Sequence, residues 1–236
     1  MTGILYLIPC PLGDTPAELV LPAHTISVAR QLRHFVVEHP KSARQFLSAL
    51  KPETPIQAMH FAELNEHTPA SALQTLLAPL LAGDDVGIIS EAGCPGIADP
   101  GADLVNLAHK SGIRVVPLVG PSSLLLALMA SGLNGQRFAF HGYLPVAEPE
   151  RSQRIGQIEA ESAKRQQTQL FIETPYRNEK LFQSLLTKCR PQTQLCIASN
   201  LTLPDEFIET RPIDQWRKQP IPPFHKRPTL FLLLAH

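Results

Sequence analysis

The residues from 90 to 101 combine the side chains and backbone features that suit contact with a ligand. The segment is Ser-Glu-Ala-Gly-Cys-Pro-Gly-Ile-Ala-Asp-Pro-Gly, with three glycines, two prolines and two carboxylates. Glycine lets the backbone approach a ligand closely, and proline holds a loop in one shape. We therefore expect this loop to contact a cofactor. A rigid connector without a ligand is the alternative that the pattern alone leaves open.

Two further loops could serve the same ligand. Residues 9–14, Pro-Cys-Pro-Leu-Gly-Asp, follow the first apolar run, and a tight turn between strand and helix is their simpler interpretation. They lack the GxGxxG pattern, which disfavours binding of NAD. Residues 119–123, Val-Gly-Pro-Ser-Ser, lead into an apolar helix. Ser122 or Ser123 could cap that helix, or its exposed amides and hydroxyls could hold a carboxylate or a ribose.

The elements that must position these loops alternate along the first half of the chain. Apolar runs predict strands at 4–8, 34–37, 55–60, 86–89 and 114–119, and amphipathic stretches predict helices near 27–32, 42–50, 70–81 and 104–110. This alternation is typical of a mainly parallel sheet with flanking helices. Because ligands bind at the carboxyl ends of such strands, the three loops are expected to converge on one crevice.

The second half of the chain predicts a different, mixed-sheet α/β domain. Strands are expected at 138–143, 169–173, 194–199, 206–210 and 229–234, helices at 150–165 and 178–188, and an ordered proline-rich loop at 211–228. We therefore predict an N-terminal domain over residues 1–119 and a C-terminal domain over 120–236.

Composition excludes several classes of protein. Lysine plus arginine and aspartate plus glutamate both number 21, so net charge gives no steering towards nucleic acid or a membrane. The four cysteines show no CxxC spacing, so neither a metal site nor a disulfide framework is expected. No apolar run approaches the ~20 residues of a membrane span, and the start lacks the features of a signal peptide. A cytoplasmic protein without a membrane partner is expected.

Six segments together resemble the tetrapyrrole methylase superfamily, the class III methyltransferases that use S-adenosylmethionine (SAM). They occur in the family's order over most of the chain, at residues 7–14, 90–101, 112–122, 132–138, 140–145 and 171–177. Within the superfamily, the chain is most similar to the family that methylates the 2'-oxygen of a cytidine in small-subunit ribosomal RNA. The resemblance implies a two-domain α/β fold, SAM in the cleft between the domains, and a homodimer.

The resemblance also implies which residues contact SAM. From the three loops of the N-terminal half they are Pro11, Ala92, Gly93, Cys94, Ile97, Ser122 and Ser123. From the C-terminal half, the residues expected near the adenine are Glu173, Asn200, Leu201 and Thr229.

The chain departs from the family at four places. Cys94 stands where the family has a side chain with a hydroxyl or carboxylate, and a thiol is a poor hydrogen-bond donor to a ribose. A reactive thiol is the less favoured alternative, since no activating base lies nearby in the sequence. Residues 38–41, Glu-His-Pro-Lys, stand where the family has Glu-Asp-Thr-Arg, and 64–66, Leu-Asn-Glu, where it has His-Asn-Glu. The family also extends past its last strand into a small helical region, whereas this sequence stops at His236.

Methylation of a ribose hydroxyl calls for a group that accepts the hydroxyl proton. The candidates are Glu38, His39, Glu66 and Glu91, each of which could instead be a solvated or structural polar group. Ribosomal RNA or the small ribosomal subunit would require positive charge on the protein. One cluster of cations lies between residues 211 and 227, with Trp216 and Phe224 expected to stack on bases. A second comprises Arg30, Arg33, Lys41 and Arg44.

Three functions are therefore open at the level of the sequence. The chain could methylate ribosomal RNA, methylate a small molecule such as a tetrapyrrole, or bind SAM without catalysis as a ribosome-associated protein. In each of the three, SAM is the expected cofactor.

Overall fold

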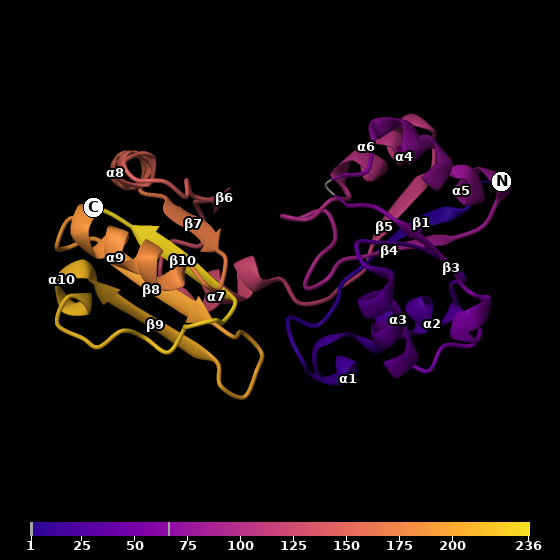
Figure 1. Cartoon of the computed structure of the whole chain (residues 1–236), viewed down its shortest axis with the longest axis horizontal. Helices are drawn as coiled ribbons and strands as arrows, with labels where there is room; N and C mark the ends of the chain where they lie inside the picture. Colours follow the sequence, from indigo (N-terminus) through magenta and orange to yellow (C-terminus); the bar gives the residue numbers. More distant parts are fainter. Residues whose placement is uncertain (1, 66) are drawn as a thin grey trace. The chain divides into compact units, whose positions relative to one another are not determined.

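The computed structural model describes residues 2–65 and 67–236 and divides the chain into two compact units, Met1–Ser122 and Ser123–His236 (Figure 1). The division lies three residues beyond the predicted one, between the last strand of the first sheet and the apolar helix that follows. No helix in the described part of the chain has both the length and the apolar character needed to cross a membrane.

Unit 1 contains a five-stranded sheet in which every pair of neighbouring strands is parallel. Its strands are β1 (Ile4–Ile8), β2 (His34–Val37), β3 (His60–Glu63), β4 (Val86–Ile89) and β5 (Arg114–Pro117), in the order β3-β2-β4-β1-β5. Ile88 pairs with Leu7 on one side and Val36 on the other. The carboxyl ends of all five strands therefore lie at the same edge, as the sequence predicts.

Helices cover both faces of this sheet, which explains why its central strands β1 and β4 are apolar along most of their length. On one face lie α1 (Ala17–Val20), α2 (Ala23–Gln31) and α3 (Pro40–Ala49), packed on residues such as Phe35 and Ile89. On the other lie α4 (Ala70–Leu76), α5 (Ala78–Ala82) and α6 (Ala102–Lys110), packed on Val36 and Ile88. Figure 1 shows the two groups of helices on either side of the strands.

Unit 2 contains a mixed five-stranded sheet. Its strands are β6 (Phe138–Tyr143), β7 (Thr168–Glu173), β8 (Gln194–Ser199), β9 (Phe207–Pro212) and β10 (Thr229–Leu234), in the order β6-β7-β10-β8-β9. Only β6 and β7 pair in parallel, and the other pairs are antiparallel. The predicted fold class, with one parallel and one mixed sheet, is confirmed.

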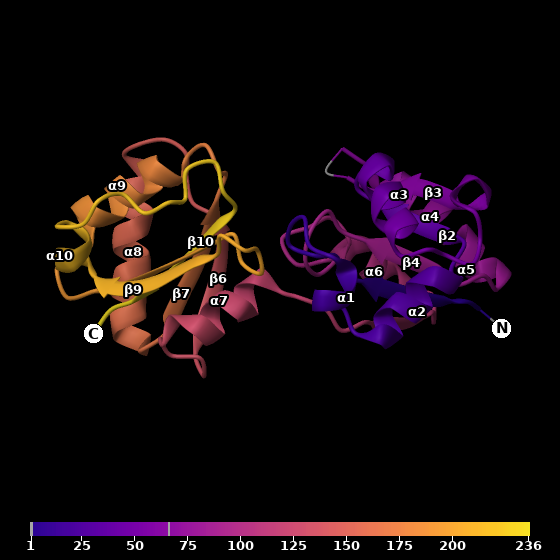
Figure 2. The same cartoon turned by 90° about the horizontal axis from the view of Figure 1, so that it is seen from below.

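The core of unit 2 lies between its sheet and the helices α8 (Glu150–Arg165), α9 (Asn178–Lys188) and α10 (Ile213–Trp216). There the ring of Phe182 packs edge-on against Trp216 and Phe224, with centroids 5.8 and 5.5 Å away. Helix α7 (Ser123–Ser131) packs on the opposite face, where the Thr210 hydroxyl of β9 donates to the Ser131 carbonyl. Figure 2 shows α8 crossing behind the strands of this sheet.

Prolines cause the main differences from the predicted elements. Residues 55–59 form no strand: Pro55 precedes a short 3₁₀ helix, η1 (Ile56–Ala58), and β3 begins only at His60. The single helix predicted at 70–81 is divided into α4 and α5, because Pro79 cannot donate the amide hydrogen bond that a continuous helix needs. The predicted loop at 211–228 includes the end of β9 and helix α10.

Candidate functional site

The loops after β1 and β4 are joined by a pair of backbone hydrogen bonds at the carboxyl edge of the unit 1 sheet. The amide of Cys10 donates to the carbonyl of Gly93 at 2.9 Å, and the amide of Gly93 donates to the carbonyl of Cys10 at 3.1 Å. The Ser90 hydroxyl also donates to the Gly93 carbonyl, at 3.0 Å. Gly93 has a φ of +72°, a conformation that favours glycine. The first and second predicted ligand loops are therefore one connected structure.

The third loop, after β5, contacts the other two. A Cβ atom added to Gly120 would lie 2.4 Å from Cβ of Pro9, so the backbone of the third loop packs directly on the Pro9 ring of the first. The thiol of Cys94 donates a hydrogen bond to the carbonyl of Pro121 at 3.4 Å. The hydroxyl of Thr25 in α2 donates to the carbonyl of Val119 at 2.7 Å. The structure thus brings the three loops together within unit 1.

A cavity of about 400 Å³ opens between the β1 loop, helix α3 and the β4 loop. Residues from all three elements line it, among them Pro11, Asp14, Ser42, Phe46, Glu91 and Ala92. The hydroxyl of Ser42 donates to Oε1 of Glu91 at 2.6 Å and so ties α3 to the β4 loop. The cavity lies within the size range of small-molecule and cofactor sites.

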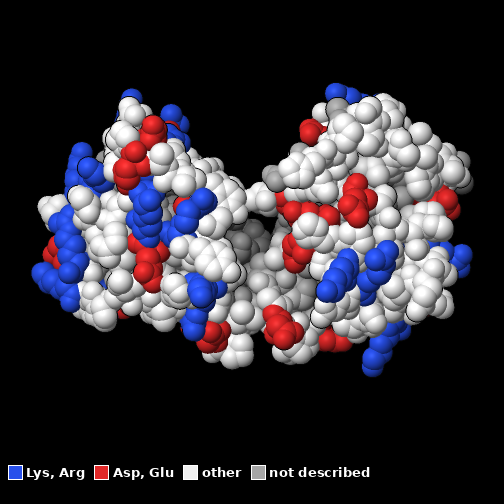
Figure 3. Space-filling view, viewed as in Figure 1, with Lys and Arg blue, Asp and Glu red and all other residues white. Residues whose placement is uncertain are grey.

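Three carboxyl groups gather beside this cavity. Glu38 directly follows β2, and Glu91 and Asp99 belong to the loop after the neighbouring strand β4. The Asp99 carboxyl lies close enough to those of Glu38 and Glu91 for their charges to act on it. Burial and the charge of Glu38 raise the pKa of Asp99 to about 7, with a smaller contribution from Glu91. Figure 3 shows acidic side chains over the loops between α3 and α6.

No cation neutralises this group of carboxyls in the part of the chain that the structure describes. None of its lysines, arginines or histidines forms an ion pair with Glu38, Glu91 or Asp99. Burial, reinforced by Glu91 and Asp99, also raises the pKa of the Cys10 thiol, which therefore stays neutral. Uncompensated like charges with a raised pKa are costly for stability and are found preferentially at functional sites.

The predicted proton acceptors have different surroundings. Glu38 and Glu91 lie together in the carboxyl group described above, whereas His39 is exposed at the start of α3, where its carbonyl accepts a hydrogen bond from Ser42. Glu66 lies outside the described residues. Asp99 was not among the predicted acceptors. Its position between the two prolines of the glycine-rich loop was the available signal, but its contact with Glu38 depends on how that loop folds.

The predicted SAM contacts of unit 1 are distributed over the joined loops. Pro11 and Ala92 line the cavity, and Gly93 forms the bridge between loops. Ile97 is half-exposed on the β4 loop. Burial raises the pKa of Cys94, which keeps the thiol neutral and disfavours the alternative of a reactive cysteine. Ser122 ends unit 1, and Ser123 begins α7 in unit 2.

The predicted SAM contacts of unit 2 lie at one end of its sheet. Thr229 pairs with Glu173 of β7 on one side and with Ser199 of β8 on the other. Asn200 follows Ser199 in a left-handed conformation, with φ +49°, and Leu201 after it is buried. The structure thus brings these four residues to one end of the sheet, and their contact with a cofactor stays a prediction.

The cation cluster near the C-terminus does not form the predicted surface for stacking and charge. Trp216 and Phe224 are 2% and 0% exposed and belong to the core, so neither can stack on a base. Nearby carboxylates and carbonyls already bind most of the cations. Arg227 pairs with Asp205, His225 with Glu179, Arg211 with Glu209 and Lys218 with Asp214, and Arg217 donates to the carbonyls of Leu186 and Cys189.

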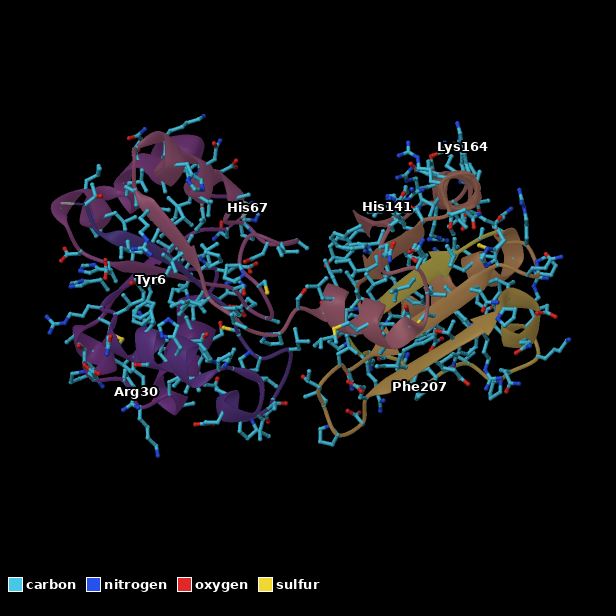
Figure 4. All side chains as sticks on the ribbon, turned by 180° about the vertical axis from the view of Figure 1, so that it is seen from behind. Tyr6, Arg30, His67, His141, Lys164 and Phe207 are labelled. Atoms are coloured by element: carbon cyan, nitrogen blue, oxygen red, sulfur yellow. The ribbon has the colours of Figure 1, made fainter. Side chains whose placement is uncertain are left out.

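The second predicted cation cluster separates into two parts. Lys41 and Arg44 are exposed on α3, the helix that lines the cavity, and Figure 3 shows basic side chains there. Arg30 donates to the carbonyl of Lys51, and Figure 4 shows it at the outer side of α2. Arg33 lines a different cavity, of about 360 Å³, at the amino edge of the sheet. Only the two α3 cations adjoin the candidate site.

Comparisons with known proteins agree with this geometry. Residues 17–216 match the family of Tetrapyrrole (Corrin/Porphyrin) Methylases. The chain belongs to this family. It is 32% identical to Ribosomal RNA small subunit methyltransferase I of Escherichia coli O157:H7 over 225 residues, which cover 92% of this chain and 73% of that protein. The protein of the same name from Vibrio cholerae is 30% identical over 210 residues, which cover 89% of this chain and 69% of that protein.

Solved structures confirm the fold of this methylase. The crystal structure of the methyltransferase CobJ has a TM-score of 0.65 and 16% identity, and the match covers 99% of this chain and 95% of that one. A uroporphyrin-III C-methyltransferase from Thermus thermophilus has a TM-score of 0.56 and 19% identity, with coverage of 100% and 93%. The predicted family and the prediction of a SAM-dependent methyltransferase are thereby confirmed.

Proposed function

We propose that this tetrapyrrole methylase transfers the methyl group of SAM to a ribose 2'-hydroxyl of small-subunit ribosomal RNA. The relatives named as ribosomal RNA small subunit methyltransferases support the class of substrate. The observation that carries the proposal is the cavity between the joined β1 and β4 loops, with carboxylates and no basic side chain among its lining residues.

The chemistry of this cavity fits SAM. When bound, SAM supplies a methyl group already activated for displacement by its positively charged sulfonium. Asp14 and Glu91 line the cavity, and neither forms an ion pair with a cation among the described residues, so a cationic ligand would compensate them. Gly93 has a positive φ, and a Cβ there would lie only 3.3 Å from Cδ2 of Leu12, so both conformation and space favour glycine at this point of the cavity wall.

Within this proposal, the loops of unit 1 hold the cofactor. Pro11 and Ala92 contact it from the cavity wall, and Gly93, Cys94 and Ile97 contact it from the β4 loop. Hydroxyls of Ser122 and Ser123 bind its polar groups. The same proposal assigns Glu173, Asn200, Leu201 and Thr229 of unit 2 to the adenine. Precise alignment of acceptor and methyl group is the main task left to these residues.

RNA would meet the site along α3. Lys41 and Arg44 are exposed there, while Ser42 and Phe46 of the same helix line the cavity. Phosphates bound by these two cations would bring a ribose towards the carboxyl group at the cavity. The paired cations between residues 211 and 227 have no such role in this proposal.

The proposal also includes a cytoplasmic homodimer that meets its RNA in the small ribosomal subunit. Support for self-association comes from the apolar side chains that α7 leaves exposed. Leu125 and Met129 are four residues apart, so they lie on the same side of the helix, and they are 52% and 79% exposed. Sedimentation of the purified protein at micromolar concentration tests this part, and a monomer at all concentrations contradicts it.

Methyl transfer is tested with SAM that carries a radioactive methyl group. The protein is incubated with small ribosomal subunits from a cell that lacks this methylase, and the labelled product is then treated with ribonuclease. The proposal expects label in RNA, lost on ribonuclease treatment, at a ribose rather than a base. Label in a ribonuclease-resistant small molecule would contradict the proposal and show that the acceptor is a small molecule instead of RNA. Binding of SAM without label in any fraction would indicate a non-catalytic protein.

The RNA-facing role of α3 is tested by the double substitution Lys41→Ala and Arg44→Ala. We expect weaker binding of the RNA and a smaller dependence on salt, with the slope of log K against log salt reduced by about 1–2. Lys110→Ala, on the exposed end of α6, is the matched control and should leave both quantities unchanged. Equal effects of the control and the α3 variant would contradict this role.

A further inference from the structure

Arg44 of α3 lies over the ring of Phe61, which belongs to the edge strand β3. The guanidinium carbon is 4.8 Å from the ring centroid, a distance at which a positive charge is attracted to the face of an aromatic ring. Helix α3 and strand β3 are neighbours in unit 1 (Figure 2). The fold therefore brings a cation and an aromatic ring together beside the helix that lines the cavity.

The core fixes the position of the Phe61 ring. Phe61 pairs with Phe35 of β2 in the parallel sheet, and their rings stack with centroids 5.6 Å apart and 19° between the two planes. Phe35 is 1% exposed and packs under the helices of the same face, whereas Phe61 is half-buried. Phe35, Phe61 and Arg44 thus form a stack that starts in the core and ends at the surface.

The outer end of this stack has no partner in the described part of the chain. Arg44 is exposed, and its side chain forms neither a hydrogen bond nor an ion pair with any described residue. By contrast Arg211, which lies over the Trp216 ring, is paired with Glu209. The aliphatic part of any long side chain could shield Phe61 from water, and such a role would leave the N–H donors and the outer face of the guanidinium unused.

We propose that Arg44 and Phe61 form a platform on which one base of the substrate RNA stacks, so that the RNA enters the site as a single strand. A guanidinium plane held against a ring has a second face free for a base, and bases of RNA are bound in this way. Stacking requires a base whose own face is free, which an unpaired segment offers and a duplex does not. The inference rests on the proposed function, and it deepens that function by naming the class of RNA.

The platform adds to the phosphate contacts that the proposed function assigns to α3. Lys41 and Arg44 are three residues apart, so they lie on the same side of the helix. The guanidinium of Arg44 can bind a phosphate through the N–H groups at its edge while a base occupies its face. Because Ser42 and Phe46 of the same helix line the cavity, a base on Arg44 holds the neighbouring nucleotides beside it.

Two variants remove the platform in different ways. Arg44→Lys keeps the positive charge and a phosphate contact, but it replaces the planar guanidinium by a compact ammonium. Phe61→Leu keeps an apolar side chain on β3 and removes the ring under the guanidinium. Arg33→Lys is the matched control, because Arg33 is also exposed but lines the cavity at the opposite, amino edge of the sheet. Hydrogen exchange of peptides from β1 and β4 at the wild-type rate shows that unit 1 of each variant is folded.

The first readout is the binding of two strands of equal length and charge. One is a short RNA of mixed sequence that forms no duplex, and the other has the same riboses and phosphates but no bases. Stacking of one base raises the affinity about 5- to 30-fold, so the wild type should prefer the strand with bases by at least this factor. The preference should fall about 5- to 30-fold in Arg44→Lys and in Phe61→Leu, with the salt dependence unchanged, and it should persist in Arg33→Lys.

Three results of this measurement overturn the inference. The first is a wild type that binds both strands equally, and the second is a preference that Arg44→Lys leaves unchanged. The third is an equal loss of affinity for both strands in Arg44→Lys, since this would indicate a contact with phosphate only.

The second readout shows where the base lies. Nitrogen-15 NMR of labelled arginine side chains identifies the Nε–H resonance of Arg44 as the one that is missing in Arg44→Lys. The strand with bases should shift this proton to higher field, because the ring current of a stacked base acts on it, and the base-free strand should not. A complex with the RNA strand in which the resonance does not shift overturns the inference.

A duplex of the same sequence tests the class of RNA. Its bases are covered by their neighbours, so Arg44→Lys should bind it as well as the wild type does, and a 5-fold or larger loss would overturn recognition of a single strand. Failure of the inference is distinct from failure of the proposed function. If small ribosomal subunits accept the methyl group and Arg44→Lys leaves the preference for bases unchanged, only the inference fails. If the wild type binds neither strand and labels no RNA, the proposed function fails and the inference fails with it.

Discussion

Replacing Gly120 by alanine should destabilise unit 1 by forcing two loops of the candidate site apart. The added Cβ would lie 2.4 Å from Cβ and 2.8 Å from Cγ of Pro9, and 3.0 Å from Cδ2 of Leu21. Ordinary contacts of a Cβ begin at 3.4 Å, so the nearest atom must move by 1.0 Å. The atoms of the Pro9 ring cannot rotate away, and the whole β1 loop has to shift with them.

The magnitude follows from two opposing contributions. Insertion of a methyl group into a packed site costs about 1–3 kcal/mol, and the loss of glycine's freedom in the unfolded chain returns about 0.4–1 kcal/mol. The two contributions together give a net loss between about 0 and 2.6 kcal/mol. Because the blocking atoms are rigid, we expect the free energy of unfolding to fall by an amount in the upper part of this range, about 1.5–2.5 kcal/mol. At 1.4 kcal/mol per factor of ten, this corresponds to a population of the open state about 10- to 60-fold larger.

Hydrogen exchange followed by mass spectrometry measures this change locally. Peptides that contain β1 and β5 should exchange about 10- to 60-fold faster in Gly120→Ala, while peptides from β8 and β10 serve as the internal reference. Gly135→Ala is the control, since no atom lies within 4 Å of the added Cβ there. Exchange of β1 and β5 within twofold of the wild type would refute the view that Gly120 seats the third loop on the first.

Three further predictions concern unit 2, whose unfolding the only tryptophan, Trp216, reports by fluorescence. Gly156→Ala, in the interior of α8 with open space around the added Cβ, should stabilise unit 2 by about 0.5–1 kcal/mol, and an unchanged urea midpoint would contradict this. Asn178→Ala should lower the free energy of unfolding by about 1–3 kcal/mol in the same assay, because the buried amide of Asn178 donates to two backbone carbonyls of the segment before β10. A loss below about 0.5 kcal/mol, the size of a neutral surface change, would contradict this and show that water replaces the amide. Hydrogen bonds from Ser152 and Ser184 and the contact with Arg151 lower the pKa of Glu148 to about 2, so its contribution to stability is present above pH 4.5 and is lost as the pH falls towards 2. The variant Glu148→Gln should therefore lack part of the acid sensitivity of the wild type in that interval, and identical acid transitions of the two proteins would contradict this.

Strands such as β1, β2 and β4 could be predicted because each is a short, mainly apolar run in a sheet that is covered on both faces. Runs such as 4–8, 34–37 and 86–89 are strands with the predicted bounds. The prediction failed at 55–59, where an apolar run suggested a strand but Pro55 precedes a 3₁₀ helix. Periodicity reports which side chains face a core, and it carries little information on where a proline interrupts the backbone.

The position of the site was also predictable, since parallel strands present their carboxyl ends at one edge. The convergence of the loops after β1, β4 and β5 follows from that topology alone. The pairing of the cations near the C-terminus could not be predicted, because a count of arginines and lysines does not reveal their partners. Arg227 and Arg217 are bound to Asp205 and to backbone carbonyls, so they are not available to RNA.

The contact between Glu38 and Asp99 shows a different limit of prediction. The glycine-rich loop after β4 contains both Glu91 and Asp99, and only the fold decides which carboxyl faces the end of β2. Gly93 and Gly96 both have positive φ, which shapes the loop before Asp99. In this loop Asp99 lies near Glu38, while Glu91 is held by Ser42 of α3. The glycines that suggested close approach to a ligand therefore have a second consequence, since the loop that they shape also brings carboxyl groups from β2 and β4 together.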